Sequence, residues 1–152
     1  MSKHLHAFVL LLHLLSVIVW LGGMFFAHVC LRPAAQASLE PPQRIPLMAA
    51  TLRRFFAVVS LAAPVAVISG AIMMTAVGLK AAPIGWHLMM LLGLVMALIF
   101  AFIRWVPYPQ LQRASGASSW PQAAAALARI RHWVLVNLVL GGLTVVCAVM
   151  LR

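Results

Sequence analysis

Acidic residues are nearly absent from this sequence, and that absence excludes several classes of protein. Glu40 is the only Asp or Glu among 152 residues, whereas Lys and Arg together number eleven. The chain therefore lacks the paired carboxylates of an acid hydrolase and the acidic proton relay of many pumps. Charge of any kind is scarce at 8%, and 65% of the residues are hydrophobic. A soluble domain of this length cannot bury so much apolar surface, so a soluble enzyme is excluded.

Long apolar runs are the most abundant feature that the sequence does have. Four runs approach or exceed the roughly 20 residues that a helix needs to cross a bilayer. They cover residues 5–31, 55–77, 86–103 and 130–151. The predicted fold class is all-α, a polytopic membrane protein whose single domain (1–152) is a four-transmembrane-helix bundle. The proline-rich segment 32–54 is predicted as a loop and 80–83 as a tight turn. Ser119-Trp120-Pro121 is typical of a helix start.

The basic residues predict the orientation of this bundle. Eight of the eleven fall in the first and third connections. They are Arg32, Arg44, Arg53, Arg54, Arg104, Arg113, Arg129 and Arg131. Positive charge favours the cytoplasmic side, so both termini are expected on the outer side. This topology explains the basic excess, and no nucleic-acid partner is predicted from it; the lipid bilayer is the expected surrounding. The two cysteines, Cys30 and Cys147, then lie near opposite faces, too far apart for a disulfide.

The first apolar run carries a stripe of polar and sulfur-containing side chains. At about 100° per residue, His6, His13 and Trp20 fall nearly on one line, because they are seven residues apart. Met24 falls within about 20° of that line and His28 within about 60°. Imidazoles that face lipid would lack partners, so we expect this stripe to face the interior of the bundle.

Imidazole and thioether together are a suitable ligand set for copper, and thioether favours Cu(I). The candidate copper ligands are His6, His13, Met24, His87, Met89 and Met90. In this interpretation an outer cluster around His13 and His87 loads the ion. An inner set of His28, Cys30 and His132 then releases it.

Histidines on facing helices are also what a b-type haem requires, which gives an alternative. The candidate axial ligands are His13, His28, His87 and His132, with His87 as the partner of His13 and His132 as the partner of His28. His13 and His28 lie about 22 Å apart along a helix, far enough for one haem near each membrane face. Spacing alone does not decide between copper and haem.

Several segments resemble the copper-resistance protein D (CopD) family, in a minimal four-helix form. They are His13-x6-Trp20-x-Gly22-Gly23-Met24, Arg53-Arg54-Phe55, His87 at the start of the third run, and Arg129-Ile130-Arg131 through Asn137 to Gly141. The similarity extends over nearly all of the chain. The first-helix pattern is also similar to that of HemJ-type protoporphyrinogen oxidases, small four-helix haem proteins with a histidine at the place of His13.

The CopD resemblance implies a protein of the bacterial inner membrane that moves copper inward from the periplasm. With the orientation that the basic residues predict, this multi-pass chain has both termini on the periplasmic side. The resemblance also implies His13 and His87 as the main ligands, Trp20 and Met24 along the path, and a separate periplasmic copper-binding protein as partner. The resulting prediction is a binding and uptake protein rather than an enzyme. The alternatives are a b-haem protein for electron transfer or porphyrinogen oxidation, and a structural subunit without a site. Four short helices leave little interior room, so the path could require a homo-oligomer.

Overall fold

The computed structural model describes residues 2–151 and contains no strand within that range. Four continuous helical stretches, Lys3–Ser38, Pro41–Val77, Ile84–Gly116 and Trp120–Met150, are each long and apolar enough to cross a membrane. The predicted all-helical fold with four spans is therefore confirmed. The elements are α1 (Lys3–Phe25), η1 (a π-helical turn, Phe26–Leu31), α2 (Arg32–Ser38), α3 (Pro41–Val77), α4 (Ile84–Trp105), α5 (Pro107–Gly116) and α6 (Trp120–Met150).

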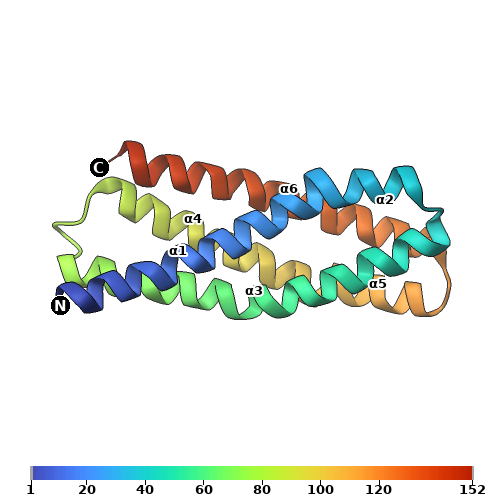
Figure 1. The fold of residues 1–152 in the computed structure, drawn as a ribbon, viewed down its shortest axis with the longest axis horizontal. Helices are drawn as coiled ribbons and strands as arrows, with labels where there is room; N and C mark the ends of the chain where they lie inside the picture. Colours follow the sequence, from blue (N-terminus) through green and yellow to red (C-terminus); the bar gives the residue numbers. More distant parts are fainter. Residues whose placement is uncertain (1, 152) are drawn as a thin grey trace.

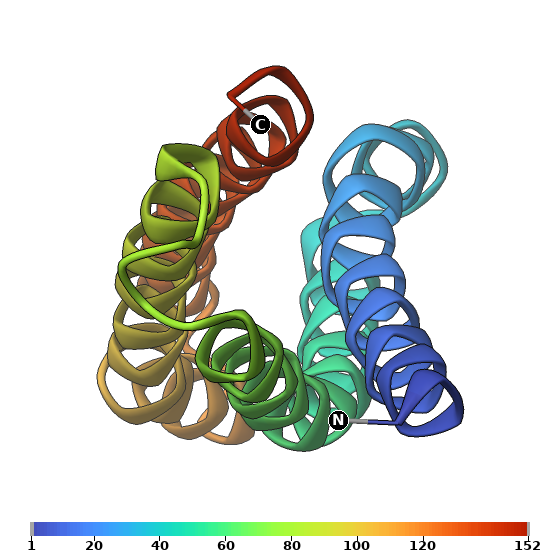
Figure 2. The same cartoon turned by 90° about the vertical axis from the view of Figure 1, so that its left-hand side faces the viewer.

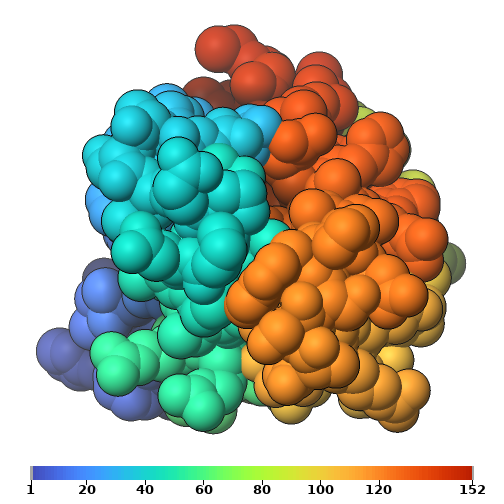
Figure 3. All heavy atoms as spheres, turned by 90° about the vertical axis from the view of Figure 1, so that its right-hand side faces the viewer, coloured from blue at the N-terminus to red at the C-terminus, as the bar shows by residue number. Residues whose placement is uncertain are grey.

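The four stretches run up and down the long axis of the molecule (Figure 1). α1 packs mainly along α3, while α6 packs along α4 and α5. Figure 2 shows these as two pairs that meet where α3 adjoins α4. α1 begins and α6 ends at one end of the bundle, here called the terminal end. The opposite end, here called the arginine end, holds α2, α5 and the connections that follow them (Figure 3).

The predicted loop over residues 32–54 is wrong, because helix covers nearly all of this segment. Only Leu39 and Glu40 separate α2 from α3. Both helices carry proline in their first turn, where the missing N–H has no helical partner to lose. Ile45, Met48 and Leu52 recur at helical spacing and are buried, so packing stabilises the helical form. Three of the four prolines of this segment thus mark helix starts, and the fourth, Pro46, lies inside α3.

The structure of the other two connections agrees better with the sequence-based predictions. The turn predicted at 80–83 lies in the connection between α3 and α4. Ser119 occupies the N-cap position of α6 and Pro121 lies in its first turn, as predicted. The fourth span therefore begins at Trp120, well before the apolar run at residue 130. Both cysteines are free thiols.

A layer of aromatic side chains fills the middle of the bundle and ties its two helix pairs together. Trp20 of α1 meets Phe100 of α4 edge to face, with ring centroids 6.4 Å apart. Phe56 of α3 packs edge to face on Phe100 at 5.7 Å and on Tyr108 at 5.0 Å. Edge-to-face pairs add to the stability already gained by burying such large side chains. These four residues are called the aromatic layer below.

One buried polar group links the second helix pair. Asn137 of α6 is 1% exposed, and its Nδ2 donates a hydrogen bond to the carbonyl of Met96 on α4 at 3.2 Å. An amide inside a membrane bundle finds its partner on a neighbouring helix because lipid offers none. This bond fixes the register of α6 against α4, two of the helices that form the site described next.

Candidate metal site

A cavity of about 410 Å³ lies between α1, α3, α4 and α6, in the half of the bundle nearer the terminal end. Two histidines and five methionines are among its lining residues. They are His6, His13, Met73, Met74, Met89, Met90 and Met96. The lining includes no acidic residue, no arginine or lysine, and no cysteine. Its possible metal ligands are therefore neutral, and most of them are soft thioethers. It is called the methionine cavity below.

His13 is the best oriented of these ligands. Its Nδ1 lies 2.8 Å from the carbonyl oxygen of Ala66 and 3.1 Å from Ser69 Oγ, both on α3. A carbonyl can only accept, so Nδ1 carries the proton and donates, which leaves the lone pair on Nε2. Metal-binding histidines are typically held by such a bond on their other nitrogen. The α3 backbone thus sets both the tautomer and the direction of the ring.

Gly70 lets an imidazole and a thioether approach each other. A Cβ atom built on Gly70 would lie 3.3 Å from His13 Cε1 and 3.6 Å from the methyl carbon of Met90. The side chains of α1 and α4 therefore converge above this bare position on α3. An imidazole and a thioether side chain from two helices that are distant in sequence thus both lie close to Gly70.

The structure brings together four of the six predicted copper ligands: His6, His13, Met89 and Met90 all line the methionine cavity. Met24 is 2% exposed and lies in the core, outside the lining. His87 is also outside the lining, and its Nδ1 lies 3.2 Å from the carbonyl oxygen of Pro83, one turn earlier.

Three lining methionines were absent from the predicted ligand set. Met96 follows Met89 by seven residues and so shares its helix face, a signal that was present in the sequence. Met73 and Met74 end the second span at the same depth as the start of the third. Their depth could be inferred from the topology, but their direction depends on how α3 is rotated in the bundle.

The structure does not bring together the inner set predicted to release copper. Cys30 and His132 are exposed, and the His132 ring packs 5.8 Å from that of its neighbour Trp133. His28 lines a separate cleft that neither of them lines. The two histidine pairs predicted for haem, His13 with His87 and His28 with His132, likewise share no cavity. Within residues 2–151, no three or more His, Cys, Asp or Glu side chains are grouped to hold a metal ion.

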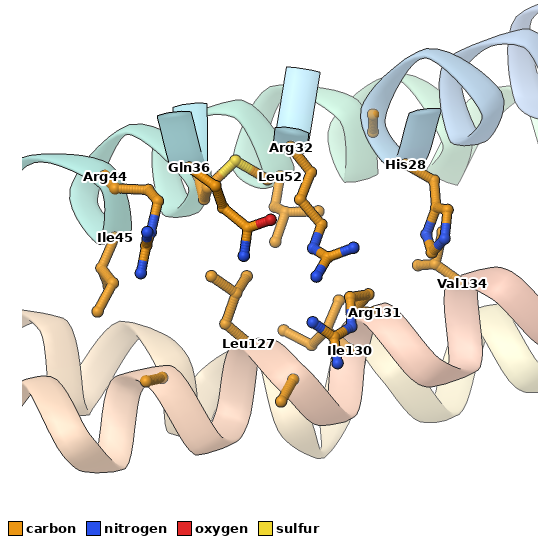
Figure 4. Close-up of a pocket in the computed structure, with 14 residues that line it drawn as sticks. His28, Arg32, Gln36, Arg44, Ile45, Leu52, Leu127, Ile130, Arg131 and Val134 are labelled. Atoms are coloured by element: carbon orange, nitrogen blue, oxygen red, sulfur yellow. The ribbon is translucent and has the colours of Figure 1, made fainter. Parts of the chain in front are cut away.

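The separate cleft has a volume of about 230 Å³ and lies towards the arginine end, between η1, α2, α3 and α6. Its polar lining consists of His28, Arg32, Gln36, Arg44 and Arg131 (Figure 4). It is called the arginine cleft below. The packed core that contains the aromatic layer separates it from the methionine cavity.

These features define a four-helix membrane protein with a neutral cavity of soft ligands in one half. The copper resistance protein D (CopD) family matches residues 49–151, well over half of the chain, and the protein belongs to that family. It is accordingly a membrane protein related to copper resistance. The match includes Arg53-Arg54-Phe55, His87 and the segment from Arg129 to Gly141, but not the first helix, so it is narrower than the predicted similarity over nearly the whole chain. No curated protein and no solved structure matches the chain.

Proposed function

We propose that this protein binds Cu(I) in the methionine cavity and takes copper up across the bacterial inner membrane. Membership of the CopD family supports a role in copper handling. The observation that carries the choice of site is the lining itself, in which an oriented imidazole lies among five thioethers. Thioether and imidazole together favour Cu(I) over harder divalent ions.

The charge of the ion agrees with the absence of charged groups from the cavity. Burying an ion away from water is costly unless it is paired or coordinated, and the cost rises with charge. A monovalent soft ion held by neutral ligands needs no carboxylate, and Glu40, the only one in the sequence, is exposed outside this lining. The cavity is therefore better suited to Cu(I) than to Cu(II) or Zn(II).

The direction of uptake follows from the distribution of arginine. The eight arginines of the first and third connections favour a cytoplasmic arginine end, which gives the methionine cavity a periplasmic location. A separate periplasmic copper-binding protein would then deliver the ion. Passage inward requires the aromatic layer to rearrange, and Met24 and Met96, both 2% exposed, are the soft ligands buried within that core. A second copy of the chain could widen this path.

The test is an anaerobic titration of the detergent-purified protein with Cu(I) in competition with a chromogenic chelator. We expect His13→Ala to abolish high-affinity binding, because it removes the one ligand whose lone pair is oriented by the backbone. His132→Ala is the matched control, since this histidine is exposed and lines neither hollow. Retained helicity and an unchanged elution volume show that both variants are folded. Unchanged stoichiometry and affinity in His13→Ala would contradict the proposed site.

The haem prediction is tested by the absorption spectrum of the same preparation, before and after dithionite. A Soret band with sharp reduced α and β bands would favour haem and contradict copper uptake as the primary function. We expect a spectrum without these bands, because the predicted histidine pairs share no cavity. Expression with ample haem makes their absence informative.

A further inference from the structure

The arginine cleft gathers positive charge from three helical segments around one hollow. Arg32 and Gln36 come from α2, Arg44 from the start of α3, and Arg131 from α6. Figure 4 shows the side chains of Arg32, Gln36 and Arg44 extending from one side of the cleft towards Arg131 and the apolar side chains of α6 on the other. Guanidinium groups present planar forks of N–H donors that match the oxygens of a phosphate.

No carboxylate lines the cleft beside these charges. Glu40, the only acidic side chain in the sequence, is exposed and does not line the cleft. Neither Arg32, Arg44 nor Arg131 is among the residues whose side chains form hydrogen bonds in the described part of the chain. Three cations around a cleft of about 230 Å³ repel one another. An anion bound between them would attract all three, and this attraction would outweigh their mutual repulsion.

The depth of the cleft matches the headgroup layer of a bilayer. The exposed large apolar side chains of the first helical stretch run from Leu5 to Val29, about 36 Å at 1.5 Å per residue. That length spans a hydrocarbon core of about 30 Å and extends into its border. Arg32 follows Val29 by three residues, so we expect the arginines of the cleft at the depth of the lipid phosphates.

The remaining lining is apolar and belongs to the bundle core. Ile45 and Leu52 of α3 lie on one side of the cleft, and Ile130 and Val134 of α6 on the other. An inorganic anion would leave this apolar wall unused, whereas a lipid places a phosphate and an adjoining apolar portion in one molecule. We propose that the arginine cleft is a binding site for the phosphate group of an anionic phospholipid, which joins α2 and the start of α3 to α6.

The experiment is native mass spectrometry and thermal unfolding of the full chain in detergent, with three additions compared at equal concentration. These are phosphatidylglycerol, phosphatidylcholine and inorganic phosphate. Each basic residue near a membrane surface strengthens binding of anionic lipid about fivefold, so we expect phosphatidylglycerol to be retained at least about tenfold better than phosphatidylcholine. Only phosphatidylglycerol should raise the unfolding temperature appreciably.

Two triple variants with the same change in charge separate a built site from general attraction. R32Q/R44Q/R131Q removes the cleft arginines, whereas R53Q/R54Q/R113Q removes three exposed arginines that do not line the cleft. We expect the preference for phosphatidylglycerol to disappear in the first and to persist in the second. Equal losses in both variants, or no preference in the wild type, would overturn the proposal. Equal stabilisation by inorganic phosphate would retain a phosphate site and overturn the lipid as its occupant.

Discussion

The two hollows of this bundle share three of its four helical stretches but have opposite chemistry. The methionine cavity, of about 410 Å³, contains neutral thioethers and imidazoles and no cation or carboxylate in its lining. The arginine cleft, of about 230 Å³, contains three guanidinium groups. Neutral soft ligands favour a soft cation, and guanidinium groups favour a hard anion. One fold thus offers a site for each sign of charge, at opposite ends of its long axis.

What separates the two hollows is as informative as what lines them. The core between them includes the aromatic layer, in which Trp20 is 3% and Phe56 is 1% exposed. Trp20 also lines the methionine cavity, so it forms part of the barrier on that side. Packed side chains therefore lie between a cation bound in one half and the positive charge of the other. Because this layer packs between the two hollows, truncating one of its side chains should have the largest effect on stability among the changes suggested here.

Trp20→Ala should weaken the fold more than any other single change suggested here. The substitution leaves a void in the aromatic layer and removes the edge-to-face contact with Phe100. Truncation of a buried Trp typically costs about 3–5 kcal/mol in the free energy of unfolding. Trp105→Ala, at a position 74% exposed, should change it by no more than about 0.5 kcal/mol. Thermal unfolding in detergent measures both, and similar losses would show that the layer does not hold the halves together.

Replacing methionines of the methionine cavity should lower Cu(I) affinity, whereas replacing a methionine of the arginine cleft should not. We expect the quadruple variant M73L/M74L/M89L/M90L to lose about a hundredfold in Cu(I) affinity, or about 2.7 kcal/mol. Leucine resembles methionine in volume, so each change should cost less than about 1.5 kcal/mol in stability. The same change in the arginine cleft, Met48→Leu, serves as the control and should leave Cu(I) affinity unchanged. Equal Cu(I) affinity in the quadruple variant would mean that the thioethers are not ligands.

Much of the fold could be predicted because apolar runs directly report membrane spans. The helix ends could not, since the prolines of residues 32–54 were read as breaks, whereas in the structure they lie mostly in the first turns of helices. That error also concealed the arginine cleft. Arg32, Gln36 and Arg44 converge only because α2 and the start of α3 are helical and fold back towards α6.

The candidate metal site was partly predictable for a similar reason. The periodicity of a single helix placed His6, His13 and Trp20 on one face, and all three line the methionine cavity. Which residues approach from the other helices depends on how each helix is rotated, and one sequence does not report this. On α4 that rotation turns Met90 towards the cavity and leaves His87, three residues earlier, outside its lining.

The smallest effect should come from Gly70→Ala. This change is informative because it should lower Cu(I) affinity without lowering stability. The new Cβ atom would lie 3.3 Å from His13 Cε1, tighter than ordinary contact, and 3.6 Å from the Met90 methyl. The ring must shift by a few tenths of an ångström, so we expect Cu(I) affinity to fall about three- to tenfold, or up to about 1.4 kcal/mol. Alanine also favours helix over glycine by about 1 kcal/mol, so stability should be unchanged or slightly higher. Gly142→Ala, where a Cβ atom meets nothing within 4 Å, should give the same stabilisation without loss of affinity. A variant that loses affinity while it keeps or gains stability would locate copper beside His13 and Met90, whereas parallel losses of both would indicate only a disturbed helix.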